Sequence, residues 1–237
     1  MSATRFRCVL YTPKKLSDLA TCEALAALLR EQHIAARKCD VVERARRPFS
    51  AATLRRCYAD EHNAFVTGSE AGFVGFFSDW GQTLSGWHFY FDVEGDPAPW
   101  CAWLERLARK LPPYFAYLCP QDDYDTRHMS LPGPKGISVP EFSRYLPGLY
   151  WMTVFGKELS AGLGRQAFAR LLDCQVKRLA GGLTSVRFQG AAVLDGYASR
   201  IRTLQKQATR LQPDLFFEPG RSSGYQQVPA LLAALGH

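Results

Sequence analysis

The residue types best suited to chemistry lie together in one short run of carboxylates. Asp122, Asp123 and Asp125 flank Tyr124, and His128 follows three residues later. Carboxylate oxygens near an imidazole can in principle hold a hard cation. Adjacent carboxylates on a loop are usually solvated, however, so the spacing favours a charged surface and we expect no metal site.

The same run can also serve as an acidic contact surface for a basic partner. Trp80, in another expected loop, would add an aromatic anchor. Aromatic and charged side chains on exposed loops make good anchors for protein–protein interfaces. We therefore predict that a partner binds through Trp80 and through Asp122, Asp123, Tyr124 and Asp125.

A second candidate is Gly220-Arg-Ser222-Ser-Gly224, a literal match to the nucleophile elbow of α/β hydrolases. In that fold the acid and the histidine of the triad follow the serine along the chain. No Asp or Glu follows Ser222, and the one later histidine is His237, the last residue. The motif therefore predicts a turn, and a hydrolase of this type is excluded.

A third candidate is Gly162-Leu-Gly164-Arg-Gln-Ala167, which matches a dinucleotide-binding pattern at an expected helix start. That pattern needs glycines directly after a strand and an acidic residue about 20 positions later for the ribose. The upstream strand is expected to end several residues earlier, and no acid lies between Asp173 and Asp195. The match does not predict a cofactor site.

His88 and Asp92 lie four residues apart on one expected strand face and could form an acid–base pair. The sequence places no serine or cysteine nucleophile beside them. An enzyme would need a deep pocket that brings His88 or His128 against carboxylates. No catalytic set remains, so we expect a non-enzymatic binding protein without a cofactor.

The composition of the 237-residue chain, with 47% hydrophobic and 22% charged residues, is typical of a globular protein. No apolar run approaches the roughly 18 residues of a membrane span, and the first residues do not read as a signal peptide. Seven scattered cysteines without a Cys-x-x-Cys pair indicate a reducing compartment. We expect a cytoplasmic protein.

The net charge of +7 permits nucleic acid as a partner. The densest basic cluster, 44–47, is short, and a second group (Arg202, Lys206 and Arg210) lies on one side of an expected helix. Such stripes are most often solvated. Nucleic-acid binding is therefore the alternative function, and direct contact with nucleic acid is not the expectation.

Hydrophobic periodicity predicts one α+β domain, 1–237, with a mainly antiparallel sheet packed against several helices. Strands are expected at 5–11, 64–67, 73–77, 87–93, 114–119, 149–155 and 183–188. Helices are expected at 17–33, 51–58 and 198–211, and also between Pro97 and Pro112. A further helix after Gly156 would carry one apolar stripe formed by Phe168, Leu171, Leu172, Val176 and Leu179.

Three of these elements carry most of the prediction. The segment 149–155 is apolar on both faces, which suits a central strand covered on each side. The segment 87–93 alternates apolar and polar residues, which indicates an antiparallel strand with 73–77 as its hairpin partner. The long proline-containing connection 120–146 is expected to be functional or disordered.

Three stretches have a familiar order: Tyr145-Leu-Pro-Gly-Leu-Tyr-Trp-Met-Thr-Val-Phe-Gly156, Pro213-Asp-Leu-Phe-Phe-Glu-Pro219 and Val228-Pro229-Ala-Leu. Together they resemble the immunity protein 52 family, which is described as α+β with a notable tryptophan and a Gly-x-Ser motif. The best matches to those two features are Trp151 and Gly220-Arg-Ser222. The resemblance covers about the C-terminal 90 residues.

This resemblance implies a bacterial immunity protein of polymorphic-toxin or type VI secretion systems. Its partner would be a toxin with a restriction-endonuclease-like DNase domain, silenced in the cytoplasm. Immunity proteins against nucleases are often acidic, whereas this chain is +7. The resemblance therefore implies steric blocking, local acidic loops such as Asp122–Asp125, or interference with toxin assembly, and not global mimicry of DNA.

Overall fold

A single antiparallel sheet of ten strands organises the described chain. The computed structural model describes residues 3–69, 72–81, 83–130, 144–189, 197–218, 221 and 223–236. The strand order is β3-β2-β4-β5-β6-β1-β7-β8-β10-β9. The strands are β1 (Thr4–Thr12), β2 (Ala36–Asp40), β3 (Arg47–Pro48), β4 (Asn63–Gly68), β5 (Val74–Asp79), β6 (Ser85–Val93), β7 (Phe115–Pro120), β8 (Met152–Phe155), β9 (Cys174–Arg178) and β10 (Thr184–Phe188).

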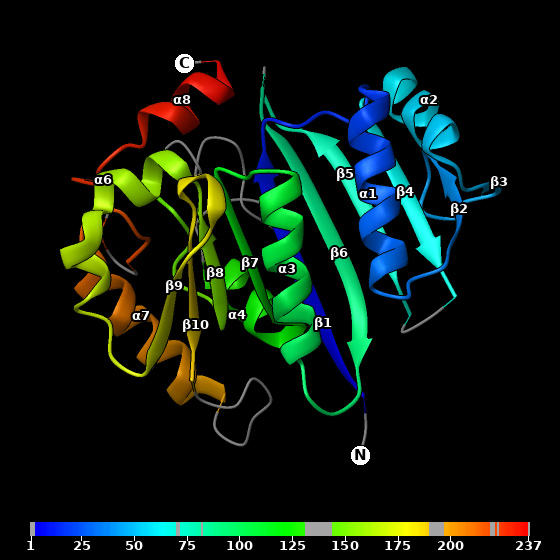
Figure 1. Ribbon diagram of the computed structural model, residues 1–237. Coiled ribbons are helices and arrows are strands. Elements are labelled where there is room, and N and C mark those ends of the chain that lie inside the picture. The colour runs from blue at the N-terminus through cyan, green and yellow to red at the C-terminus, as the bar shows by residue number, and fades with distance from the viewer. Residues whose placement is uncertain are drawn as a thin grey trace.

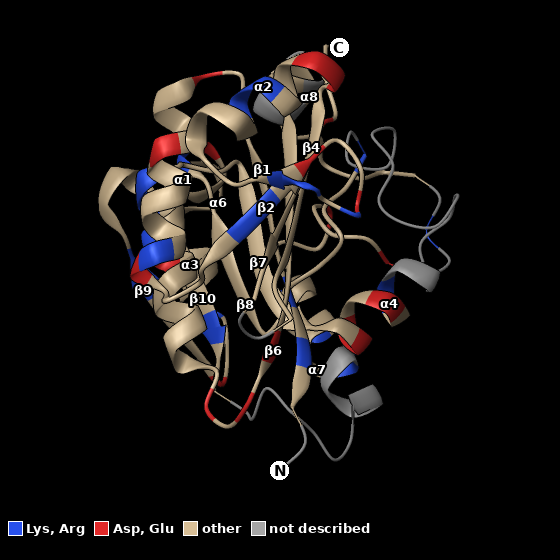
Figure 2. Ribbon diagram, turned by 90° about the vertical axis from the view of Figure 1, so that its right-hand side faces the viewer, with Lys and Arg blue, Asp and Glu red and all other residues tan. Residues whose placement is uncertain are grey.

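The strands of this sheet pair antiparallel and helices lie on both of its faces, so the fold is α+β, as the sequence predicted. Helices α1, α2 and α3 cover one face, and α4 and α7 lie on the other (Figures 1 and 2). The helices are α1 (Leu19–Glu31), α2 (Ala51–Glu61), α3 (Ala98–Lys110), α4 (Gln121–Ser130), α6 (Lys157–Phe168), α7 (Tyr197–Leu211) and α8 (Pro229–Leu235), with a 3-10 turn η1 (Ala180–Gly182). Within the described ranges, none of the helices has the length and apolarity needed to cross a bilayer.

The apolar side chains that alternate along β6, as predicted, form the core beneath α1 and α3. Trp87, Phe89 and Phe91 are fully buried on that side. The Phe89 ring lies edge-on to Trp103 of α3, with centroids 5.3 Å apart. Trp103 Nε1 donates a hydrogen bond to the Leu28 carbonyl of α1 at 3.1 Å. Burial and this shared hydrogen bond fix the two helices on the sheet.

Local capping explains where α1 and α2 begin. The Asp18 carboxylate accepts hydrogen bonds from the N–H groups of Ala20 and Thr21, and Ser50 Oγ accepts one from the N–H of Thr53. These side chains satisfy donors that the first helical turn leaves unpaired. The observed helices therefore begin at Leu19 and Ala51, within two residues of the predicted starts at 17 and 51.

The predicted central strand is confirmed as β8, although it is shorter than expected. All four residues of β8 are buried, with β7 on one side and β10 on the other. Thr153, the polar residue among them, accepts a hydrogen bond from the Tyr150 N–H at 3.0 Å. A buried hydroxyl with a partner carries little cost.

The prediction of a long helix after Gly156 is wrong for the second half of that segment. Helix α6 ends at Phe168, and Gly164 already breaks its regular geometry at φ 71°. The chain then turns into β9, where Val176 pairs with Val186 of β10. Leu172 and Val176 are 52% and 38% exposed, so they form no helical core stripe. A β-branched residue suits this pleated edge.

The prediction of a long connection over 120–146 is also wrong in its first part, because Gln121–Ser130 forms α4. The side chains of Asp123, Tyr124 and Arg127 recur at helical spacing and point inward. Residues 131–143 lie outside the described residues. Strands β2 and β3 were not predicted, because Ala36-Arg-Lys-Cys-Asp40 has no alternation of apolar and polar residues.

Candidate partner-binding face

One part of the sheet has helices on only one side. Helix α4 contacts β1 and β7, and no described helix packs on the same face of β4 and β5. Alternate residues of these two strands are half-buried, whereas their neighbours, which face α1 and α2, are buried. We call this surface the uncovered face. Its residues include Phe65, Thr67, Val74, Phe76 and Tyr90, and the exposed Lys38 of β2 is paired with Thr67.

Strand register places aromatic rings side by side on the uncovered face. Phe65 of β4 is paired with Phe76 of β5, and Phe76 is paired with His88 of β6. The ring centroids are 4.7 Å apart for the first pair and 6.0 Å for the second. Cross-strand aromatic pairs of this kind stabilise a sheet and expose an apolar surface. This row forms the floor of the candidate site.

Trp80 lies at one end of this floor. Its ring stacks on His88 with centroids 5.8 Å apart and meets Tyr11 edge-on at 5.5 Å. Its Nε1 donates to Ser78 Oγ at 2.6 Å, and its ring lies directly over Gly86. The structure therefore brings Trp80 to the same side of the sheet as α4. It is half-buried against the sheet and is not the tip of an exposed loop.

Helix α4 forms one wall, and its predicted site residues divide into two pairs. Asp122 and Asp125 are exposed, whereas Asp123 and Tyr124 are only 1% and 7% exposed. Asp123 accepts from Arg127 Nε at 2.5 Å, and Arg127 Nη1 donates to the Leu149 carbonyl at 2.6 Å. Burial lowers the pKa of Arg127, but Asp123 and Tyr150 together with smaller contributions raise it overall. Asp123 therefore anchors the wall.

Tyr124 anchors the same wall to the floor through Arg7 of β1. The guanidinium of Arg7 lies between two phenol rings, 3.4 Å from the Tyr124 centroid and 4.6 Å from the Tyr90 centroid. Its Nη2 lies 2.9 Å from His88 Nδ1. Among the described residues, no carboxylate forms an ion pair with Arg7. The aromatic faces supply the compensating interaction for this cation.

The loop between β2 and β3 follows Asp40, which is paired with Phe65 of the floor, and we call this loop the second wall. The Asp40 carboxylate accepts from the N–H groups of Val41 and Arg46 at 2.9 and 3.3 Å and lies 3.7 Å from Arg47 Nε. The Val41 hydrogen bond and these neighbours hold the pKa of Asp40 below its usual value. A carboxylate stabilised in this way closes the loop and presents Glu43 at the surface.

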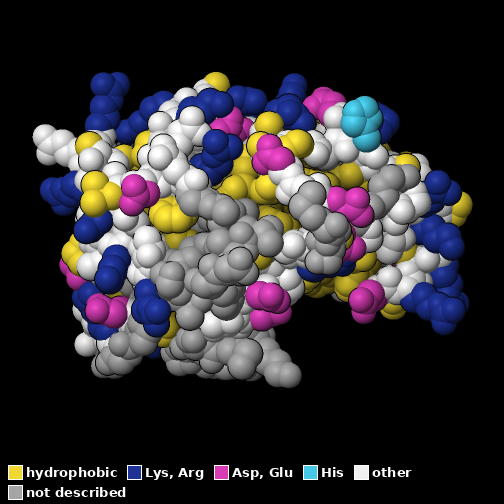
Figure 3. Space-filling view, turned by 90° about the horizontal axis from the view of Figure 1, so that it is seen from below, with side chains coloured by type: hydrophobic (Ala, Val, Ile, Leu, Met, Phe, Trp, Pro, Cys, Tyr) yellow, Lys and Arg dark blue, Asp and Glu magenta, His cyan; other side chains and the backbone are white. Residues whose placement is uncertain are grey.

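The net effect of burial and of the surrounding charges raises the pKa of Tyr90. Burial raises the pKa of Tyr90 and Arg7 lowers it, while Asp125 of α4 and Glu43 of the β2–β3 loop each raise it. Seen from below, the outline of the molecule is hollowed, with hydrophobic side chains inside and both acidic and basic side chains at the margins (Figure 3).

Of the residues matched to the family resemblance, Trp151 does not contribute to this face. Trp151 is buried, with its ring edge-on to Phe6 at 6.2 Å, so it belongs to the core. Gly220 and Ser222 lie outside the described residues, as does the side chain of His128. Within the described ranges, no three His, Cys, Asp or Glu residues are grouped as a metal site requires.

A polar cluster that the sequence analysis missed surrounds Asp79 at the end of β5. Asp79 accepts hydrogen bonds from Lys15 at 2.6 Å, from Ser85 at 3.1 Å and from the Tyr58 hydroxyl, and His62 Nδ1 lies 3.2 Å away. Ser85 is fully buried and unavailable to a substrate. The cluster therefore ties four elements together and has no accessible nucleophile.

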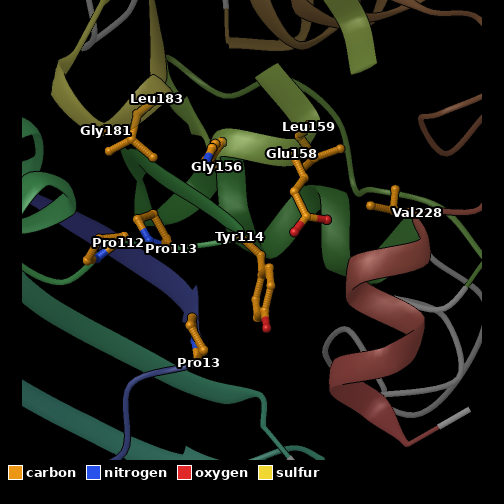
Figure 4. Close-up of a pocket in the computed structure, with 11 residues that line it drawn as sticks. Pro13, Pro112, Pro113, Tyr114, Gly156, Glu158, Leu159, Gly181, Leu183 and Val228 are labelled. Carbon is orange, nitrogen blue, oxygen red and sulfur yellow. The ribbon is translucent and has the colours of Figure 1, made fainter. Parts of the chain in front are cut away.

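A separate apolar cavity of about 280 Å³ lies at the start of α6. Figure 4 shows Pro13, Pro112 and Pro113 on one side of it, Val228 on the other, and the Tyr114 side chain between them. Ligand sites need a few convergent polar groups in addition to apolar walls. Prolines and aliphatic side chains dominate this lining, and nothing selects an occupant.

The basic stripe predicted on the last long helix is present on α7. Arg202, Lys206 and Arg210 are exposed, and Leu204 and Leu211 are buried on the opposite side. None of the ion pairs among the described residues involves this stripe. It is available to solvent or to a polyanion.

Comparisons with known proteins identify a shared fold. No protein family matches the sequence, and no curated protein matches it. Among solved structures, the chain is similar to a Pseudomonas aeruginosa T6SS protein, PA0821. The TM-score is 0.56 at 16% sequence identity, over 98% of this chain and 82% of that one. At this identity the likeness concerns the fold.

Proposed function

We propose that this chain is a non-enzymatic immunity protein that binds and neutralises a nuclease toxin of a type VI secretion system in the cytoplasm. The observation that carries the proposal is the uncovered face, a hollow with an aromatic floor and polar walls. Its fold is shared with a T6SS protein, and that likeness supports the same setting for this chain. The resemblance to the immunity protein 52 family adds the nuclease as the kind of toxin.

The face has the composition of a protein-binding surface. Interfaces concentrate aromatic residues at the centre and polar residues at the rim. Here Phe65 and Phe76 form the centre, and exposed polar side chains lie on α4 and on the β2–β3 loop. A partner that covered this floor would bury aromatic area, which dominates the energy of protein–protein binding.

Inhibition of this kind needs no chemistry from the immunity protein. Covering the toxin's catalytic cleft or its assembly surface is enough, and the anchored walls supply a rigid shape for this. The net charge of +7 makes overall imitation of DNA an unsuitable mechanism. Contact through one local face is the mechanism that fits this net charge.

The test is a titration of DNA cleavage by the nuclease effector encoded beside this chain. We expect one equivalent of the wild-type chain to abolish cleavage and to form a complex that survives gel filtration. The substitution Phe76→Lys at the face should weaken inhibition, while Val176→Lys at the exposed edge strand β9 serves as its matched control. A nuclease that stays fully active with excess wild-type chain contradicts the proposal.

The second candidate function, binding of nucleic acid, is favoured by the exposed stripe on α7. Arg202, Lys206 and Arg210 lie on one side of the helix at four-residue spacing. Phosphate contacts by three cations would make the affinity fall steeply with salt. Retention of DNA or RNA at low salt, lost in a variant with all three residues changed to Gln, would favour this function. No retention at low salt excludes it.

A further inference from the structure

We propose that the hollow between α7 and the segment after it binds single-stranded nucleic acid, with phosphates on the basic stripe and a base on Phe217. This inference rests on the second candidate function, because it names the form of nucleic acid and the place that receives it. The buried side of α7 shares a core with Val186 of β10, whereas β4 and β5 lie in the other half of the sheet (Figure 1). The site is therefore separate from the uncovered face.

A cavity of about 310 Å³ lies between one side of α7 and residues 213–218. Its volume is at the lower end of ligand sites, which span about 300–1,000 Å³. Its lining combines cations and a hydroxyl of the helix with a proline, an aromatic ring and a carboxylate of the segment: Arg202, Lys206, Thr209, Pro213, Phe217 and Glu218. The cavity thus offers both polar and flat apolar contacts to one occupant.

Backbone hydrogen bonds hold the Phe217 side of the cavity in place. The N–H of Leu146 donates to the Leu215 carbonyl at 2.9 Å, and the N–H of Phe217 donates to the Leu146 carbonyl at 2.8 Å. The Phe217 ring packs on Tyr145, with centroids 5.1 Å apart, and it remains half-buried. A fixed aromatic ring beside a cavity is a platform on which an unpaired base can stack.

The region around the cavity is positively charged. The stretch 197–236 contains two carboxylates and five cations: Asp214 and Glu218, and Arg200, Arg202, Lys206, Arg210 and Arg221. Arg221 pairs with both carboxylates, with Nη2 2.7 Å from Asp214 Oδ1 and Nη1 3.9 Å from Glu218 Oε2. Within the described ranges, neither Arg202 nor Lys206 forms an ion pair. These two exposed cations therefore attract an anionic ligand, and the carboxylates of the region are already engaged.

The spacing of the cations on α7 suits a chain of phosphates. Arg202, Lys206 and Arg210 follow one another at four-residue intervals. Successive cations are therefore about 6 Å apart along the helix axis. Adjacent phosphates of a nucleic-acid strand have a similar separation. The stripe can thus follow a backbone over several phosphates.

The aromatic platform selects a single strand over a duplex. Paired bases cover one another's faces within the stack, whereas unpaired bases are free to stack on aromatic side chains. The stripe alone would bind either form, because contacts to phosphate carry no information about the base. Phe217 beside the stripe makes the difference.

The experiment measures binding of a labelled oligothymidylate of ten nucleotides by fluorescence anisotropy, at low and at high salt, together with a duplex of the same length. The charge variant is Arg202→Gln/Lys206→Gln. Its control, Arg109→Gln/Lys110→Gln, removes the same charge from exposed residues at the end of α3, on the other face of the sheet. The stacking variant is Phe217→Leu, which keeps an apolar side chain without a flat ring.

We expect the strand to bind the wild-type chain more tightly than the duplex does, and less tightly at high salt. The charge variant should weaken strand binding by about tenfold or more and reduce its salt dependence, with little effect of the control. Phe217→Leu should weaken strand binding by about fivefold or more and leave the salt dependence unchanged, because it removes stacking and no charge.

Four results overturn the inference: no binding of the strand at low salt, equal or tighter binding of the duplex, equal effects of the charge variant and its control, or unchanged affinity of a folded Phe217→Leu variant. Displacement of the strand by an equal concentration of thymidine monophosphate overturns it too, because the cavity would then belong to a soluble nucleotide.

Ultraviolet cross-linking of a strand that carries bromouracil replaces the stacking variant if thermal unfolding shows that Phe217→Leu disturbs the fold. Cross-links within 213–218 are expected, and cross-links found only elsewhere contradict the proposal. None of these measurements involves the toxin. Retention of nucleic acid with full affinity in Phe217→Leu refutes this inference alone and leaves the second candidate function standing.

Discussion

The guanidinium carbon of Arg7 lies 3.4 Å from the centre of the Tyr124 ring, and this contact joins α4 to the sheet. The same guanidinium lies 4.6 Å from the Tyr90 ring on the floor of the hollow. One side chain of a central strand therefore sets the distance between the acidic wall and the apolar floor. The shape of the proposed binding face depends on this arrangement.

Replacing Arg7 with Met should loosen α4 without unfolding the sheet. The loss of two cation–π contacts should lower the free energy of unfolding by about 1–3 kcal/mol. Hydrogen exchange should rise in 121–127 and stay unchanged in α1. Arg5→Met is the control, because its ion pair with Asp92 is more than a third exposed and contributes about 0–1 kcal/mol. Equal exchange in α4 of both variants would refute this role of Arg7.

Removing one partner of the Asp123–Arg127 pair should be more harmful than removing both. Asp123→Ala leaves a buried, uncompensated guanidinium and should cost about 3–5 kcal/mol of unfolding free energy. Asp123→Leu/Arg127→Met replaces the pair with apolar groups of similar size and should cost less. Urea unfolding of both variants provides the measurement. A double variant less stable than the single one would contradict this account.

Acid should weaken the cluster around Asp79. Burial alone would raise the pKa of Asp79, but hydrogen bonds from Lys15 and Tyr58 hold it below the ordinary value of 3.8. The ionised carboxylate therefore stabilises the fold above that value, and this contribution is lost as the pH falls through the lowered pKa. The stability difference between wild type and Asp79→Asn should shrink between about pH 5 and pH 2. A constant difference would show that the charge of Asp79 contributes nothing.

Two glycines of the same region should respond in opposite directions to alanine. A Cβ on Gly156 would lie 2.4 Å from the Pro113 carbonyl oxygen, and backbone cannot move aside cheaply. Gly156→Ala should therefore cost about 1–3 kcal/mol. Gly162 lies in α6 with open space around it, so Gly162→Ala should stabilise the chain by about 0.5–1 kcal/mol. Thermal unfolding of the two variants checks both values. A neutral Gly156→Ala would refute the close approach of β7.

The sequence predicted the elements whose burial follows a clear period. The alternation of Trp87 to Val93 and the doubly apolar run before Gly156 both became strands of the sheet. The predicted helix starts at 17 and 51 lie within two residues of the observed ones, where Asp18 and Ser50 cap the helices through local interactions. Where the pattern was ambiguous, as in 171–179, apolar residues of an edge strand were read as a helical stripe.

The candidate site was predictable only in part. Trp80 and the carboxylates of α4 were chosen for residue type, and the structure places them on one side of the sheet. The floor was not found, because Phe65 and Phe76 look like ordinary strand residues until the missing cover is known. Nor does the sequence distinguish Asp123, which is buried by Arg127, from Asp125, which is exposed. Both distinctions depend on contacts between segments far apart in the chain.

Hydrogen exchange of the chain, free and in complex with the nuclease effector, tests the central claim most directly. The account predicts protection on binding in β4, β5 and β6 and in 121–127, with no change in α1, α2 and α3. Loss of that protection in Phe76→Lys, with a complex still formed by Val176→Lys, would complete the assignment. Protection confined to the helices of the opposite face, or no protection with an active nuclease, would contradict it.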